Sequence, residues 1–69
     1  MLADAIDLVV RSGSASTSML QRRFRIGYNR AANIMDMMEE RGIIGPADGA
    51  RARKVLVSVE ELEQMEDGE

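Results

Sequence analysis

Apolar residues recur at three- and four-residue intervals in the first part of the chain, which is the spacing of one helix face. The first such group consists of Leu2, Ala5, Ile6, Val9 and Val10. Gly13 follows as a residue type that commonly ends a helix. The spacing therefore predicts a first helix over residues 2–12.

A second, shorter helix is predicted from about residue 17 to residue 23 or 24. Its apolar side would be formed by Met19, Leu20 and Phe24. Its N-cap candidates are three consecutive hydroxyl residues, Ser16, Thr17 and Ser18. Ser18 with Gln21 has the spacing of a capping box. The next three residues leave room only for a tight turn, in which Gly27 can take a positive φ at little cost.

A third helix is predicted from Tyr28 to the residues before Gly42. At about 100° per residue, one side of this helix takes Tyr28, Ala31, Ala32, Ile34, Met35 and Met38. The opposite side takes Asn29, Asn33, Asp36 and Glu40, with Arg30 and Met37 beside them. The methionines are expected to fill the core, and Met37 is the one least suited to burial.

The chain after the third helix has the pattern of a β-hairpin. Residues 43–44 are a short apolar pair, residues 45–50 have loop composition, and residues 55–57 are a β-branched run. The order of elements predicts an α+β fold class: a small winged helix-turn-helix, with three helices plus a β-hairpin wing.

The predicted domain division separates this fold from an acidic end. Residues 1–58 would form the winged-helix domain. Residues 59–69 would form an acidic C-terminal tail, a short helix and then a disordered end. Ser58 with Glu61 is a capping-box pair that can start the short helix.

Composition narrows the possible functions. The chain of 69 residues makes one domain at most, and it has no cysteine and no histidine. It therefore lacks a disulfide, a thiolate nucleophile, the usual general base and the commonest metal ligand. Any catalysis would therefore depend on paired carboxylates, but Glu39 and Glu40 are sequential on a helix and point apart. We expect a non-catalytic domain without cofactor, metal or small-molecule substrate. It shows no membrane-spanning run and no signal-peptide pattern, which predicts a soluble, cytoplasmic domain.

The net charge of −3 averages over unlike segments. All nine basic residues lie between Arg11 and Lys54, whereas the first ten and the last ten residues contain acids and no base. A basic middle part matters because local positive potential, more than the charge of the whole chain, drives binding to phosphates.

The predicted fold places these bases where a winged helix contacts DNA. The N-terminal residues of the second helix of such a motif reach base edges in the major groove, and here they are Asn29, Arg30 and Asn33. Arginine pairs bidentately with guanine and asparagine with adenine. The expected phosphate contacts are Ser16, Thr17, Ser18, Arg22, Arg23, Arg25, Arg51, Arg53 and Lys54. Solvated surface charge and simple helix capping are the alternative explanations of these side chains.

Two continuous sequence runs and one motif of spaced residues near the C-terminal end indicate a family. They are L-Q-R-R-F-R-I-G-Y-N-R-A-A over residues 20–32, M-E-E-R-G-I-I-G-P over residues 38–46, and G-x-x-x-R-x-V-L from Gly49 to Leu56. The chain thereby resembles the C-terminal gamma domain of the FtsK/SpoIIIE family of bacterial DNA translocases. The resemblance covers nearly the whole chain and implies a winged-helix domain at the end of a hexameric, ATP-driven motor. No G-x-x-x-x-G-K-[ST] motif is present, so this chain itself would not hydrolyse ATP.

The resemblance also implies a function and partners. Gamma domains of this family recognise short, G-rich, directional motifs on double-stranded chromosomal DNA, and so orient the motor during chromosome segregation at cell division or sporulation. Several gamma domains bind one motif together, and FtsK-type members also contact and activate a Xer-type site-specific recombinase. The parent protein of the family is typically anchored in the inner membrane by an N-terminal segment that this chain lacks.

The family's recognition positions fall on Asn29, Arg30 and Asn33 of this chain. Asn33 departs from the arginine that is common at this position, and asparagine favours adenine over guanine.

Two other functions fit a winged helix. A free-standing transcription regulator would need a dimer interface, for which no spare apolar helix is visible. A protein–protein interaction module, such as one for recombinase activation, would show an exposed apolar patch in place of the three polar residues.

Overall fold

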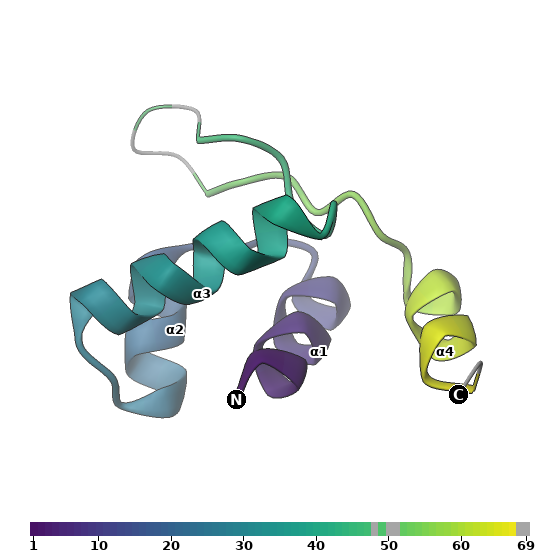
Figure 1. Ribbon diagram of the computed structural model, residues 1–69, viewed down its shortest axis with the longest axis horizontal. Helices are drawn as coiled ribbons and strands as arrows, with labels where there is room; N and C mark the ends of the chain where they lie inside the picture. Colours follow the sequence, from purple (N-terminus) through teal and green to yellow (C-terminus); the bar gives the residue numbers. More distant parts are fainter. Residues whose placement is uncertain (48, 50–51, 68–69) are drawn as a thin grey trace.

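Each of the predicted helices forms in the computed structural model, which describes residues 1–47, 49 and 52–67. The described part contains four helices, namely α1 (Leu2–Ser12), α2 (Thr17–Phe24), α3 (Tyr28–Glu40) and α4 (Val59–Asp67). Helix α3 packs against both α2 and α1, and α4 packs against α1 (Figure 1). No helix of the described part is both long and apolar enough to cross a membrane.

Local capping explains where α1 ends and where α2 begins. Gly13 adopts the left-handed conformation, with φ 80°, and its N–H donates to the Val9 carbonyl at 2.9 Å. Ser16 is the N-cap of α2, and its Oγ accepts the Met19 N–H at 3.2 Å. The predicted capping box of Ser18 with Gln21 is therefore wrong: Ser18 lies inside the helix, because Ser16 is the residue that caps the first turn by accepting the Met19 N–H.

The turn between α2 and α3 uses a different residue from the one predicted. Arg25, not Gly27, has the positive φ, at 54°. The reason is that a left-handed residue is needed directly after α2, where the Ile26 N–H returns to the Gln21 carbonyl at 3.3 Å in a Schellman-type closure. Gly27 is instead extended, with φ −75°, and serves as the N-cap of α3.

The two predicted strands are reduced to isolated β-bridges in the described residues. Ile44 pairs with Val55, and Ala15 pairs with Arg53, both antiparallel. The Gly45 N–H donates to the Lys54 carbonyl at 2.9 Å, and the Leu56 N–H donates to the Ile43 carbonyl at 2.8 Å. The ladder does not grow toward α3, because the Ile43 N–H donates to the Met38 carbonyl at the end of that helix.

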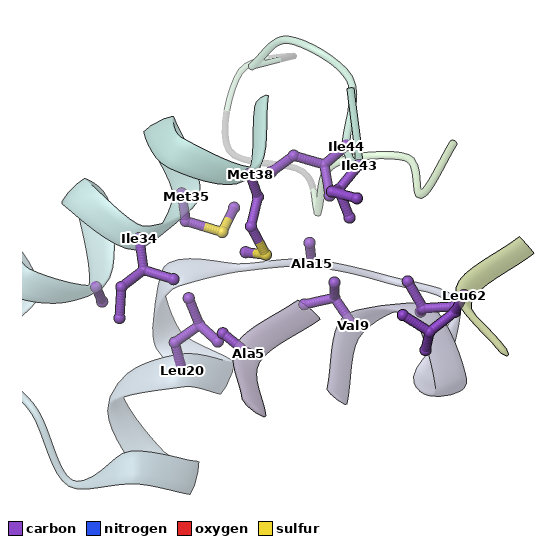
Figure 2. Close-up of a cluster of buried hydrophobic side chains, with 12 residues drawn as sticks. Ala5, Val9, Ala15, Leu20, Ile34, Met35, Met38, Ile43, Ile44 and Leu62 are labelled. Carbon is purple, nitrogen blue, oxygen red and sulfur yellow. The ribbon is translucent and has the colours of Figure 1, made fainter. Parts of the chain in front are cut away.

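The core lies where α3 crosses α1 and α2, and every buried residue in the described part of the chain is apolar (Figure 2). Its largest fully buried side chains are Leu20, Met38, Ile44 and Val9. Met37 is 38% exposed, as expected, but Tyr28 is 62% exposed, so its predicted place on the apolar side is wrong. Tyr28 is the first residue of α3, and the buried positions of that helix begin only at Ala31.

The C-terminal helix packs on the rest of the domain. The Glu61 N–H donates to Ser58 Oγ at 3.1 Å, and this hydroxyl donates to Glu61 Oε1 at 3.4 Å, so the predicted Ser58–Glu61 pair forms. Leu62 is only 4% exposed and belongs to the common core, where it lies beside α1 (Figure 2). Helix α4 therefore contributes a buried apolar side chain to the core. The division of the chain at residue 58 remains a prediction.

Candidate nucleic-acid interface

The three predicted base-reading residues lie together on the open side of α3. Asn29, Arg30 and Asn33 are all exposed, because the opposite side of the helix is buried through Ala31, Ile34, Met35 and Met38. Positions three and four residues apart are neighbours on a helix surface, so Asn33 lies beside both of the others. None of the three side chains has a hydrogen-bond or ion-pair partner among the described residues. Their donors and acceptors are therefore available to a ligand.

The starts of α2 and α3 favour an anion. Neither helix has an acidic residue in its first turn, whereas α1 has Asp4 there and α4 has Glu60 and Glu61. The N-cap of α3 is Gly27, which provides no side-chain hydrogen bond to the free N–H groups. The positive ends of both helix dipoles therefore have no compensating carboxylate within their own first turns.

Three arginines surround the turn between these helices. Arg22 and Arg23 belong to the last turn of α2, and Arg25 follows it directly. All three are exposed and have no partner in the described part of the chain. Arg25 holds its left-handed conformation without being a glycine, which costs on the order of 1–2 kcal/mol. Backbone strain of this kind clusters at functional sites.

The hydroxyl residues at the start of α2 line an open hollow of about 350 Å³. Its other lining residues include Tyr28 at the start of α3, Gly49 in the loop and Arg53. The hollow thus brings together the predicted residues Ser16, Thr17, Ser18 and Arg53. Tyr28 was not predicted here, and its only sequence signal is its place as the first residue of α3.

The basic residues of the loop after Ile44 are placed differently from one another. Lys54 is exposed to solvent. Arg53 is engaged, since its Nη1 lies 2.8 Å from Glu39 Oε1 and its side chain is only 16% exposed. Arg51 lies outside the described residues. Among the described residues, no group of three or more His, Cys, Asp or Glu side chains comes together as a candidate metal site.

These features define a small helical domain that carries a basic, amide-rich surface at the start of α3. Residues 1–58 match the family described as the Ftsk gamma domain, and the chain belongs to this family.

Relatives of high identity support this assignment. The chain is 56% identical over 64 residues to "DNA translocase FtsK" of Corynebacterium glutamicum, which covers 93% of this chain and 7% of that protein. It is 53% identical over 62 residues to "DNA translocase SpoIIIE" of Bacillus subtilis, which covers 90% of this chain and 8% of that protein. It is 66% identical over 53 residues to "DNA translocase FtsK" of Lactiplantibacillus plantarum, for 77% and 7% respectively. The chain thus spans less than a tenth of the length of these relatives.

Proposed function

We propose that this gamma domain binds double-stranded DNA sequence-specifically and reads short G-rich directional motifs for an FtsK/SpoIIIE-type translocase. The observation that carries the proposal is the set of Asn29, Arg30 and Asn33, which are exposed and have no partner among the described residues, on a helix whose other side is buried in the core. A base-reading surface needs such side chains, because a polar group already satisfied within the protein has little to gain from a base edge.

In this proposal α2 and α3 act as a helix-turn-helix, and the segments paired at Ile44 and Val55 act as the wing. Helix α3 enters the major groove with its N-terminal end leading. Arg30 donates to O6 and N7 of a guanine, while Asn29 and Asn33 pair with adenine edges. Each such pair discriminates against a wrong base by about 1–3 kcal/mol.

The surrounding groups hold the DNA backbone. Arg22, Arg23 and Arg25 contact phosphates on one side of α3. On the other side, the phosphate contacts come from Ser16, Thr17, Ser18 and Tyr28 in the hollow, together with Lys54 on the wing. Such contacts fix the register of the domain on the duplex without reading sequence.

The parent protein supplies the rest of the function. The relatives are named DNA translocases and are more than ten times longer than this chain, so we assign the ATP-driven motor to segments outside it. Several gamma domains of one cytoplasmic hexameric motor bind a motif together, which raises weak individual affinity through effective concentration. A Xer-type recombinase is a second partner in FtsK-type members.

A fluorescence titration tests the proposal. The duplexes carry either a G-rich octamer of the family type or a scrambled octamer of equal composition, and each is titrated at several salt concentrations. We expect the wild type to prefer the G-rich octamer and Arg30→Ala to lose most of that preference. Arg11→Ala removes the same charge from α1, where Arg11 pairs with Asp7, and should retain the preference.

Equal binding of both duplexes by the wild type, with the same salt dependence, would refute sequence reading and leave only an electrostatic surface. That result would favour the interpretation of the domain as a protein–protein interaction module.

A further inference from the structure

Arg53 differs from the other basic residues of the proposed interface, because both its backbone and its side chain are engaged within the domain. Its N–H donates to the Ala15 carbonyl at 2.8 Å. Its Nη1 donates to Glu39 Oε1, also at 2.8 Å. The side chain is 16% exposed, whereas Arg22, Arg23 and Arg25 are exposed and unpaired in the described part of the chain.

These two contacts join three segments that are distant in sequence. Ala15 directly precedes Ser16, the N-cap of α2. Glu39 lies in the last turn of α3, and Arg53 lies on the returning arm of the loop that follows Ile44. The peptide group of Arg53 therefore fixes this arm against the start of α2, and its side chain fixes the arm against the end of the proposed recognition helix.

The charge of Arg53 is also compensated inside the domain. Glu39 is an acid on the proposed recognition helix, and an unpaired carboxylate there would oppose the approach of phosphates. Its partner is the guanidinium of Arg53, so the pair presents little net charge to a duplex. Lys54, the next residue, remains exposed and keeps its charge available.

We propose that Arg53 is a positioning residue, which sets the wing relative to α3 through Glu39, and that it is not a phosphate ligand. This inference rests on the proposed function and assigns a role within it. It predicts that breaking the Arg53–Glu39 pair changes sequence preference, because the distance between wing and major-groove contacts is no longer fixed. The number of phosphates that are neutralised stays the same.

The test compares Arg53→Met, Glu39→Gln, the double variant and the charge swap Arg53→Glu with Glu39→Arg. Each is titrated with the two octamer duplexes over a salt series. We expect each single variant to lower the preference for the G-rich octamer by about twofold to fivefold, the range of a partly exposed ion pair. The double variant should be no worse than either single one, and the swap should restore part of the preference. The double variant removes one charge of each sign, so its salt dependence should equal that of the wild type.

Lys54→Met serves as the matched control. It should weaken binding to both duplexes equally and reduce the slope of log K against log salt by about 0.9, the loss of one phosphate contact. If Arg53→Met behaves in this way and Glu39→Gln leaves binding unchanged or tighter, Arg53 is a phosphate ligand and the inference is overturned.

Amide hydrogen exchange of the free domain separates this inference from the proposed function. The amide of residue 53 is hydrogen-bonded to Ala15, so it should be protected in the wild type and exchange faster in Glu39→Gln. Lack of sequence preference in the wild type would refute the proposed function alone. Unchanged exchange at residue 53 in Glu39→Gln would overturn the positioning role, whatever the DNA titration gives.

Discussion

Replacing Arg25 with glycine should make the domain more stable and a weaker DNA binder at the same time. Arg25 sits at φ 54° and ψ 49°, a left-handed conformation that costs an L-residue on the order of 1–2 kcal/mol and glycine almost nothing. Glycine also raises the conformational entropy of the unfolded chain, which reduces the gain in the free energy of unfolding by roughly 0.5–1 kcal/mol. Arg25 is exposed, so little buried contact is lost. The expected net gain in the free energy of unfolding is therefore about 0.5–1 kcal/mol.

Urea unfolding monitored by circular dichroism measures this gain, and thermal unfolding should show a rise in Tm of a few degrees, roughly 4–8 °C per kcal/mol for a domain of this size. Arg25→Ala is the matched control, because it removes the same guanidinium but retains a Cβ in the left-handed region. Each variant should bind both duplexes more weakly than the wild type does, and the loss of affinity should be the same for the G-rich and the scrambled duplex. If Arg25→Gly is no more stable than Arg25→Ala, the argument from backbone strain fails.

Further predictions concern the core, the caps and the phosphate contacts. Leu62→Ala should lower the free energy of unfolding by about 2–3 kcal/mol, because this side chain is buried against α1, while exposed Glu63→Ala should change it by less than about 0.5 kcal/mol; equal effects in urea unfolding would show that α4 is not part of the core. Ser16→Ala should cost about 1 kcal/mol and Ser18→Ala clearly less, since only Ser16 caps α2; the reverse order in the same measurement would contradict the observed cap. Arg22→Ala should weaken both octamer duplexes equally and reduce the salt slope by about 0.9, whereas a change in preference between duplexes would indicate base contact.

The helices could be predicted well because their determinants are local. The repeat of apolar positions and the stop at Gly13 lie within a few residues of the elements that they define. The turn could not be predicted to the residue, because the left-handed position depends on which carbonyl the Ile26 N–H reaches. The strands were overestimated, since nothing in the sequence indicates that the Ile43 N–H bonds to the end of α3.

Some features of the candidate site were predictable from the sequence and others were not. Exposure of Asn29, Arg30 and Asn33 follows from the apolar face of their own helix and was predictable from the sequence. The engagement of Arg53 was not, because its partner Glu39 lies 14 residues away and on another element. The position of Tyr28 beside the hollow depends on how the starts of α2 and α3 meet, which is also a property of tertiary packing.

The packing of acidic α4 on α1 gives the molecule two electrically different ends. In Figure 1, α4 lies at the opposite end from α2 and the start of α3, and the longest dimension of the domain is 32 Å. That dimension is several times the Debye length of about 8 Å at physiological ionic strength. A duplex at the basic end is therefore largely screened from the acids of α4. The net charge of −3 therefore does not describe the potential at the start of α3, which is set by the nearby arginines and not by the distant acids of α4.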